Sequence, residues 1–310
     1  MNRVLVTGAR GFLGCPIANL LVERGWDVIR TATTPCQEHV VVDLLDDAAV
    51  LALVRKVEAT HLVHAAWKSV HGDVMRSTDN LAWLRSSLGL VKCFREAGGR
   101  RTAILGTSAE YDWTNGVCRN GVTPLRPATL YGACKHALHV TLEAYAGASG
   151  LEFVWPRVFS AYGPGEHESR LVPSVIRALV RGEVAKCTHG RQVLDYVHVN
   201  DIAAGVVASL ESDHQGSIDI TSGVGISVRD VVATIARLLD GEDLVRFGAR
   251  PNPDRDFPMV VGDGAEAHLQ LGWSTTLSLE EGIAGTIEWG RAVFAPAAEH
   301  RMQTTRRVHI

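Results

Sequence analysis

The sequence predicts an α/β fold built on a doubly wound parallel sheet, with a smaller α/β domain in the carboxyl-terminal half. Three observations carry this prediction. Short apolar segments alternate with amphipathic segments through the first half, a glycine-rich turn follows the first apolar segment, and the 310 residues are 46% hydrophobic and 21% charged. That composition suits a globular protein with a large core, and strands separated by helices form parallel sheets covered on both faces.

Each element of the first half is predicted from its periodicity. Short apolar runs bounded by turns predict strands, and apolar residues at helical spacing predict helices. Strands are expected at Arg3 to Thr7, Asp27 to Thr31, His39 to Val42, His61 to His64, Thr102 to Leu105 and Glu152 to Val158. Helices are expected at Phe12 to Arg24, Asp47 to Val57, Asn80 to Ala97 and through Tyr131 to Tyr145.

The pattern loosens after about Phe159, where proline and glycine become frequent. Shorter helices are expected there at Leu171 to Arg181 and Ser227 to Leu239. We therefore expect residues 1–158 to form the main domain and residues 159–310 the smaller one, with segments around 194–222 returning to the main sheet.

The charge balance and the apolar runs exclude several classes of protein. Lys and Arg total 31 and Asp and Glu total 34, so a net charge of −3 argues against a nucleic-acid binder. No apolar run reaches the roughly 20 residues that span a bilayer, and no leader pattern opens the chain, so we expect a cytoplasmic protein without a membrane partner. The six scattered cysteines predict reduced thiols and no metal site.

A glycine triplet lies between the first strand and the first helix. Gly8 permits a tight turn, Gly11 lets the backbone approach a pyrophosphate, and Gly14 allows close packing of the helix. The free N–H groups and the dipole at the start of a helix favour phosphate groups. With a strand before it and a helix after it, the triplet predicts a dinucleotide site rather than a structural turn.

The end of the second strand bears on the choice of cofactor. NAD sites usually place an acidic side chain there for the ribose 2′-hydroxyl, but this segment contains none. Arg10 and Arg30, with the hydroxyls of Thr31, Thr33 and Thr34, could instead surround a 2′-phosphate. We therefore expect NADP(H) in preference to NAD(H), although the same residues also fit a solvated strand end.

A tyrosine and a lysine lie four residues apart on a predicted helix, so the side chains of Tyr131 and Lys135 share one face. A nearby ammonium stabilises a phenolate, which predicts a tyrosine pKa below its usual value near 10. Such a tyrosine can exchange the proton that accompanies hydride transfer at a carbonyl or alcohol carbon. Thr107 and Ser108 follow the fifth strand and are expected in the same crevice.

Several segments in order carry a resemblance to a known family. They are Thr7 to Gly14, His64 to Ala66, Asn80, Thr107 to Tyr111, Tyr131 to Lys135, Pro156 to Phe159, Tyr162 to Gly165 and Asp195 to Asp201. Over about residues 1–290 they resemble the extended short-chain dehydrogenase/reductases, in the group of nucleotide-sugar epimerases, dehydratases and reductases. The resemblance implies a Rossmann-type NAD(P)-binding domain at 1–158, a nucleotide-sugar domain at 159–310, and a homodimer through the helices at 80–97 and 131–145.

The resemblance also implies a catalytic set of Thr107, Tyr131 and Lys135. Thr107 is preferred to Ser108 because it lies four residues before Tyr111, as the catalytic hydroxyl does in the family. Together with the motifs above, it assigns to the cofactor Gly8, Arg10, Gly11, Phe12, Leu13, Gly14, Arg30, Thr31, Thr33, Asp43, Leu44, Ala65, Ala66, Trp67, Asn80, Tyr131, Lys135 and Val158. It assigns to a nucleotide-diphosphate sugar Lys68, Ser69, Ser108, Ser160, Leu171, Val172, Arg191 and Arg250.

Two positions depart from the family pattern. Leu194 stands where the family has an arginine, so one phosphate ligand is missing and Arg191 is expected to compensate. Ser160 stands where the family has an asparagine. Both departures concern the pose of the substrate and leave the cofactor site intact.

The family's three reactions have different chemical needs. A 4,6-dehydratase carries acid–base carboxylates one or two positions after the catalytic threonine, where this chain has Ser108 and Ala109. An epimerase keeps NAD tightly bound, which the missing acid disfavours, whereas a reductase needs only Tyr131, Lys135 and a hydroxyl. We therefore expect an NADPH-dependent ketoreductase of a nucleotide-linked 4-keto-6-deoxy sugar. The alternatives are an NAD-dependent nucleotide-sugar 4-epimerase and, since Tyr131 and Lys135 are both retained, less readily a non-catalytic NADP-sensing module.

Overall fold

The first half folds into one parallel sheet, which confirms the predicted fold class. The computed structural model describes residues 2–67, 74–252 and 257–295. The larger sheet has eight strands. One of them, β6 (Gly106–Thr107), pairs only with β8 and lies outside the main strand order. The other strands run in the order β12 (Gly216–Ile220), β8 (Glu152–Val158), β5 (Arg101–Ile104), β4 (His61–His64), β1 (Arg3–Thr7), β2 (Asp27–Ala32) and β3 (His39–Val41).

All pairings in this sheet are parallel, and the strand order reverses between β1 and β4. In doubly wound sheets, ligands bind beyond the carboxyl ends of the strands at the point where the order reverses. The topology therefore fixes one place for a ligand, and the glycine turn follows β1 at that place.

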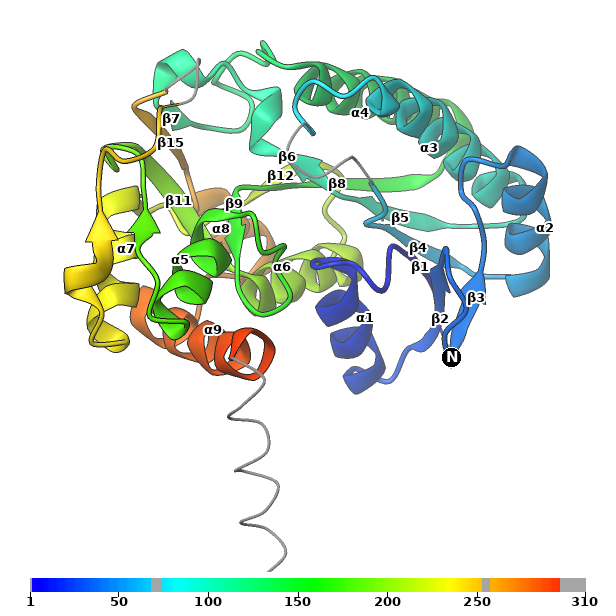
Figure 1. Cartoon of the computed structure of the whole chain (residues 1–310). Coiled ribbons are helices and arrows are strands. Elements are labelled where there is room, and N and C mark those ends of the chain that lie inside the picture. Colours follow the sequence, from blue (N-terminus) through cyan, green and yellow to red (C-terminus); the bar gives the residue numbers. More distant parts are fainter. Residues whose placement is uncertain (1, 68–73, 253–256, 296–310) are drawn as a thin grey trace, which may run out of the picture.

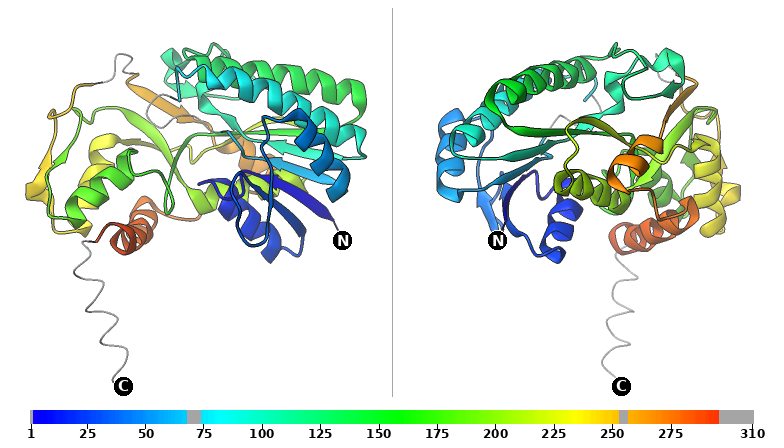
Figure 2. Two further views of the ribbon diagram at one scale, coloured as in Figure 1. Left: turned by 45° about the vertical axis from the view of Figure 1, so that its right-hand side comes forward. Right: turned by 180° about the vertical axis from the view of Figure 1, so that it is seen from behind.

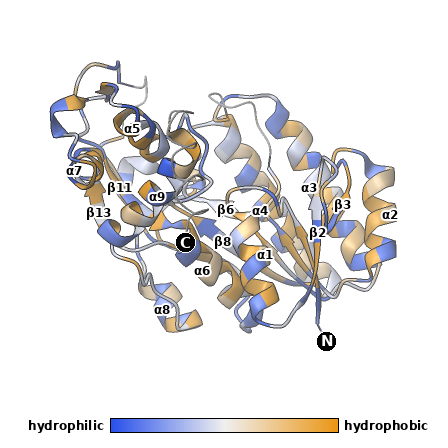
Figure 3. Cartoon of the chain, turned by 60° about the horizontal axis from the view of Figure 1, so that its bottom comes forward, coloured by the Kyte–Doolittle hydropathy of each residue, from blue (hydrophilic) through white to orange (hydrophobic). Residues whose placement is uncertain are grey.

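Helices cover both faces of the larger sheet. On one face lie α1 (Gly14–Glu23) and α6 (Val199–Glu211), and on the other lie α2 (Asp47–Val57), α3 (Asp79–Glu96) and α4 (Leu130–Ser149) (Figures 1 and 2). Successive side chains of a strand point to opposite faces. Val4 and Val6 accordingly join the core beneath α1 and α6, while Leu5 joins the core beneath α2, α3 and α4. Figure 3 shows hydrophobic and hydrophilic residues side by side on α1 and α2, as helices with one buried face require.

Local capping explains where two of these helices begin and end. The Asp46 carboxylate accepts hydrogen bonds from the backbone N–H groups of Ala48 and Ala49, which starts α2. Thr129 caps α4 in the same way, and Gly150, with φ of 66°, ends it in the left-handed conformation. The caps make α4 begin directly before Tyr131.

The second half builds a smaller unit beside the larger sheet, at the end away from α2 (Figures 1 and 2). Its core lies among α5 (Leu171–Val180), α7 (Val228–Leu238) and α9 (Leu279–Phe294). Its five-stranded sheet contains β13 (Gly225–Ser227), β11 (Val193–His198), β15 (Met259–Gly262), β7 (Val117–Cys118) and β9 (Ser160–Tyr162), and a separate pair contains β10 (Ala185–Lys186) and β14 (Val245–Arg246). No helix of the described ranges has both the length and the apolar character to cross a bilayer.

The two units are interleaved along the chain. Within the segment expected to return to the main sheet, β12 pairs with β8, whereas β11 lies in the smaller sheet. The short strand β7 from the first half pairs with β15 of the second half, and α8 (Ala265–Leu271) packs against β12 and α6. The division at residue 158 stays a prediction, because strands on both sides of it contribute to the opposite unit.

Asp195 on β11 joins the two units through a buried carboxylate. Beyond the end of β12, it accepts hydrogen bonds from the Thr221 and Ser222 hydroxyls and from the backbone N–H groups of Ser222 and Gly223. It also accepts one from the backbone N–H of Gly262, which ends β15, at 3.2 Å. A buried carboxylate is tolerated only when its oxygens are satisfied in this way. Asp195 therefore fixes the smaller sheet against the larger one.

We predict that Asp195→Asn lowers the free energy of unfolding by about 2–4 kcal/mol, because an amide cannot accept from all of these donors. Urea unfolding followed by circular dichroism measures the change. Asp213→Asn, at an exposed position, is the matched control and should change it by less than about 0.5 kcal/mol. Equal stabilities for the Asp195 variant and the wild type would contradict the role given to this carboxylate.

Candidate active site

Thr107, Tyr131 and Lys135 lie together at the carboxyl edge of the larger sheet. Thr107 ends β6 and caps the short helix η1 (Ser108–Glu110). Tyr131 and Lys135 lie one turn apart at the start of α4. A hydrogen bond joins the side chain of Thr107 to the Tyr131 phenol. The structure thus brings together the three side chains that the sequence predicts as catalytic.

The phenol of Tyr131 is less acidic in this chain than the sequence suggests. Part of its ring is exposed, but the surrounding protein desolvates the hydroxyl and raises its pKa to about 12. The hydrogen bond with Thr107 and the charge of Arg170 lower the pKa by less, and the charge of Glu110 raises it. The expectation that Lys135 brings the pKa of Tyr131 below its usual value is wrong for the chain without bound ligands. Desolvation of the phenol outweighs the interactions that favour the phenolate.

The ammonium of Lys135 faces a carbonyl group and an aromatic ring. Its Nζ donates a hydrogen bond to the Leu105 carbonyl oxygen at 2.9 Å and lies 4.0 Å from the centroid of the Trp67 ring. The side chain is buried, and desolvation lowers the pKa of Lys135 to about 7, against the charge of Glu110, which raises it. Lys135 is therefore poised between its charged and neutral forms near neutral pH.

The glycine turn after β1 fits the backbone path that a dinucleotide pyrophosphate needs. Gly8 has φ of 70°, and a Cβ there would lie 2.8 Å from the backbone nitrogen of Ala66. A Cβ at Gly14 would lie 2.2 Å from the carbonyl oxygen of Gly8, so neither position accepts a side chain. At Gly11 only that carbonyl oxygen is near, which leaves the outer side open to a phosphate. No side chain caps the start of α1, at Leu13, so its first N–H groups are available for an anion.

The residues at the end of β2 form an exposed basic and hydroxyl-bearing collar. The Arg10 guanidinium donates a hydrogen bond to the Thr34 hydroxyl at 2.7 Å. Thr33 is also exposed, and Arg30 is half-buried on β2. Thr31, by contrast, is only 2% exposed, so its side chain lies inside the protein and not at the collar. Contacts of Arg10, Arg30 and Thr33 with a cofactor ribose stay a prediction, which their exposure or partial exposure permits.

The other residues assigned to the cofactor differ in how far they are exposed. Ala65, Ala66, Trp67, Phe12 and Leu13 are half-buried at the carboxyl edge of the sheet. Leu44, Asn80 and Val158 are buried, and exposed Asp43 accepts a hydrogen bond from the backbone N–H of Leu45 at 3.0 Å. Asn80 is held inside the protein, where its side-chain nitrogen donates to the carbonyl oxygens of Val74 and Ser77.

The residues assigned to the substrate are more dispersed. Lys68 and Ser69 lie outside the described residues. Ser108 follows Thr107, and Ser160 on β9 pairs with Tyr196 on β11. Val172 is buried in the core of the smaller unit. The last three residues of this group are Leu171, which begins α5, and Arg191 and Arg250, which are exposed on loops of the smaller unit.

Sequence reasoning missed Glu166 and Arg170 in the smaller unit. The Arg170 guanidinium contacts the Glu166 carboxylate at 3.4 Å, and its charge reaches Tyr131 across the crevice. Burial raises the pKa of Glu166 to about 7. The only sequence signal for these two residues is that they follow the motif Tyr162 to Gly165, because the approach of Arg170 to Tyr131 depends on how the two units pack.

A buried ion pair supports Thr107 from behind. Glu110 is fully buried and accepts hydrogen bonds from the Thr107 backbone N–H at 2.9 Å, from Trp155 Nε1 at 2.9 Å and from Arg157 Nε at 3.2 Å. Arg157 also donates to Asn120 at 2.8 Å. Since Glu110 points into the core and is neutralised there, it is not available as an acid–base group for a dehydration.

Glu110, His136 and His139 form a cluster of potential metal ligands that the sequence did not reveal. One potential ligand atom from each residue lies within 4.8 Å of the others. The Arg157 guanidinium beside Glu110 and His139 repels a cation, and the Glu110 carboxylate is already occupied by three donors. This donor set therefore does not fit a metal ion, and the absence of a metal site stays a prediction.

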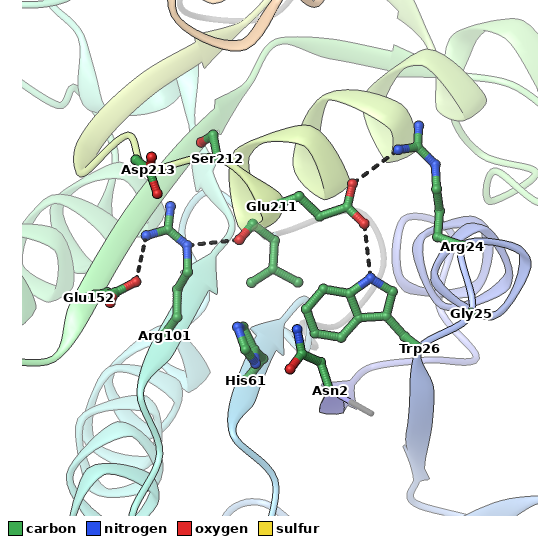
Figure 4. A pocket seen from close by; sticks show the side chains of 11 residues that line it. Asn2, Arg24, Gly25, Trp26, His61, Arg101, Glu152, Glu211, Ser212 and Asp213 are labelled. Carbon is green, nitrogen blue, oxygen red and sulfur yellow. Dashed lines mark hydrogen bonds and ion pairs between the residues drawn. The ribbon is translucent and has the colours of Figure 1, made fainter.

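A cavity of about 490 Å³ opens at the opposite edge of the larger sheet, at the amino ends of its strands (Figure 4). Four of its charged side chains form two ion pairs. Arg101 contacts Glu152 at 3.1 Å, and Glu211 accepts from Arg24 at 3.0 Å and from Trp26 Nε1 at 2.9 Å. This cavity is thus a structural feature that lies apart from Tyr131.

Comparison with known proteins connects this geometry to a family. Residues 4–221 match the NAD dependent epimerase/dehydratase family. The chain is 29% identical over 300 residues to a UDP-glucose 4-epimerase of Corynebacterium glutamicum, with 88% of this chain and 90% of that protein covered. It is 24% identical over 307 residues to UDP-glucuronic acid decarboxylase 1 of Arabidopsis thaliana, with coverages of 91% and 68%.

Solved structures agree with the fold. A UDP-glucose 4-epimerase of Thermus thermophilus in complex with NAD has a TM-score of 0.81 and 26% identity, and the match covers 93% of this chain and 99% of that one. A UDP-glucose 4-epimerase of Thermotoga maritima with UDP-glucose has a TM-score of 0.85 at 22% identity, with coverages of 94% and 99%. The glycine turn, the Thr–Tyr–Lys site and these matches lead to one conclusion: the chain belongs to the NAD-dependent epimerase/dehydratase family, a group of extended short-chain dehydrogenase/reductases.

Proposed function

We propose that this chain catalyses hydride transfer at carbon 4 of the hexose in a nucleotide-diphosphate sugar, with Tyr131 as its acid–base group. The observation that carries the proposal is the hydrogen-bonded pair of Thr107 and Tyr131 next to the buried ammonium of Lys135. This group lies at the carboxyl edge of the sheet, as does the glycine turn that fits a dinucleotide.

Each of the three side chains has a distinct role in this proposal. A bound nicotinamide cofactor would accept or supply the hydride. Tyr131 removes the proton from the sugar hydroxyl during oxidation and returns a proton to the oxygen during reduction. Thr107, hydrogen-bonded to the same phenol, orients the sugar oxygen. Lys135 supplies positive charge that favours the phenolate and would hold the nicotinamide ribose.

Two forms of the reaction compete, and we place the 4-epimerase first. Its support is the similarity to UDP-glucose 4-epimerases of Corynebacterium glutamicum and Streptomyces lividans, over 88% and 93% of this chain. One specific observation still favours the ketoreductase that the sequence predicts. The end of β2 carries no carboxylate for a ribose 2′-hydroxyl, and Arg10 lies beside Thr34 there. This collar supports NADP(H), which a reductase would consume.

We also propose a homodimer through α3 and α4. Leu81 on α3 is 54% exposed and Val140 on α4 is 50% exposed, so both helices present apolar side chains away from the sheet. Sedimentation velocity on the intact chain measures the oligomeric state.

We predict that Tyr131→Phe lowers kcat by at least about 10²-fold, because general acid–base catalysis by a positioned side chain contributes roughly 10²–10⁴. The binding constant of the cofactor, measured by calorimetry, should change by less than about twofold, since the hydroxyl serves the proton transfer. Tyr145→Phe, on the same helix, is the control and should keep wild-type kcat. An active Tyr131→Phe variant would refute the assignment.

Cofactor turnover separates the two forms of the reaction. If the chain is an epimerase, UDP-glucose and UDP-galactose interconvert with no net change in the absorbance of reduced cofactor. If it is a ketoreductase, a nucleotide-linked 4-keto sugar oxidises one NADPH for each carbonyl reduced. A preparation that does neither with any nucleotide sugar would contradict the proposed function as a whole.

We predict that replacing Arg10 and Arg30 together by alanine weakens NADPH binding about 10- to 100-fold and NADH binding by less than about threefold. The physical reason is that charge-assisted hydrogen bonds to a 2′-phosphate contribute about 1.5–3 kcal/mol. Fluorescence titration with each reduced cofactor measures both constants. Arg24→Ala, at the opposite edge of the sheet, is the control. An unchanged ratio of the two constants would exclude the collar as a phosphate site.

A further inference from the structure

We propose that Trp67 is a positioning residue whose indole holds the Lys135 ammonium at its face and the Tyr131 ring at its edge. This role rests on the proposed function of Tyr131 and Lys135, and it differs from the cofactor contact expected from the sequence. Three separate contacts of the same indole carry the inference.

The first two contacts join Trp67 to both proposed catalytic side chains. Lys135 Nζ lies 4.0 Å from the centroid of the indole, which is the geometry of a cation–π interaction. The Tyr131 ring meets the indole edge to face, with centroids 6.1 Å apart and planes at 75°. One rigid ring therefore touches the two side chains whose relative position the chemistry depends on.

The third contact fixes the indole itself. Trp67 Nε1 donates a hydrogen bond to Asn80 Oδ1 at 2.8 Å. The amide nitrogen of Asn80 donates to the carbonyl oxygens of Val74 and Ser77, each at 2.8 Å, so the amide orientation is determined. Because Asn80 is fully buried at the start of α3, the indole cannot turn without leaving a buried polar group unpaired.

The charged form of Lys135 needs this support. Its side chain is 3% exposed, and the Leu105 carbonyl oxygen is one hydrogen-bond acceptor for an ammonium with three protons. The titratable groups around it are Glu110 on η1, His64 at the end of β4 and Tyr131 on its own helix, with Arg157 on β8 beyond Glu110.

Only Glu110 among these groups favours the positive charge on Lys135. Burial and the charge of Lys135 lower the pKa of His64 to about 3, so this histidine is neutral near pH 7. Two indoles also face the ammonium, with 4.0 Å from Lys135 Nζ to the ring centroid of Trp67 and 5.9 Å to that of Trp155, so the Trp67 indole is the nearer stabiliser. Since burial already lowers the pKa of Lys135 to about 7, loss of the indole should lower this pKa further and leave more of the lysine neutral at pH 7.

The pKa of Lys135 can be measured directly, because the chain has only five lysines. We would label lysine with ¹³C at Cε, titrate by NMR, and assign Lys135 from the signal lost in Lys135→Arg. In Trp67→Met, which keeps an apolar side chain without an aromatic face, the Lys135 pKa should fall by about one unit. In Trp67→Phe it should fall by less. In the control Trp83→Phe, whose ring centroid lies 6.3 Å from that of Trp67 with the planes tilted by 31°, it should not move.

A second measurement avoids any change in packing. Fluorinated tryptophan, incorporated at all seven tryptophan positions, weakens the negative faces of Trp67 and of the more distant Trp155 with little change of shape, so the Lys135 pKa should fall as fluorine atoms are added. In Trp67→Met the same fluorination should lower this pKa by much less, which assigns the fall to Trp67. An unchanged pKa in both Trp67→Met and the fluorinated protein would overturn the inference. A fall of equal size in Trp83→Phe would overturn it as well.

The pH profile of kcat links the inference to the reaction. The alkaline limb that reports loss of the ammonium should move to lower pH in Trp67→Met by the same amount as the NMR titration. A wild-type chain that is inactive on every nucleotide sugar would overturn the proposed function. The NMR titration needs no turnover, so it would still show whether Trp67 stabilises the Lys135 ammonium. An active Trp67→Met variant with an unchanged profile would show that the indole does not position Lys135.

Discussion

The buried carboxylate of Glu110 is the constraint on which the arrangement of the site depends. It accepts hydrogen bonds from the Thr107 backbone N–H and from Trp155 Nε1, and it pairs with Arg157 on β8. Removing two such charges from water is costly, and the cost is offset only because the donors around Glu110 saturate it. The strand ends, the short helix after Thr107 and the start of α4 are thereby locked to one geometry, and Glu110 still influences the pKa values of Tyr131 and Lys135 from outside the crevice.

The same burial that organises the site also sets its electrostatics. Desolvation raises the pKa of Tyr131 and lowers that of Lys135, so each group is pushed toward its neutral form. Opposing influences come from the hydrogen bond with Thr107, from Arg170 of the smaller unit and from the aromatic face of Trp67. Proton exchange at the phenol consequently depends on both units, because the hydrogen bond with Thr107 comes from the larger unit and the charge of Arg170 from the smaller one.

Much of this architecture could be predicted from local sequence patterns. The alternating strands and helices, the glycine turn and the one-turn spacing of Tyr131 and Lys135 are properties of short segments, and the structure reproduces them. Helix α1 begins at Gly14 rather than Phe12, because the turn needs the intervening residues. The roles of Glu110, Arg170 and Trp67 arise from long-range packing, and the direction of the Tyr131 pKa shift depends on a burial that no local pattern encodes. Short strands such as β6 and β7 were likewise invisible to periodicity.

The interleaving of the two units has a consequence for how such a chain can be recombined. A cut at residue 158 would leave the larger sheet without β12 and would separate β7 from β15. Neither fragment would then contain all the strands of its own sheet. Asp195 and the donors that follow β12 would stay in one fragment, but β12 would have lost its pairing partner β8. Exchange of the smaller unit between relatives therefore requires several junctions in one step. Changing one unit without disturbing the other is accordingly easier by point substitution than by swapping whole modules.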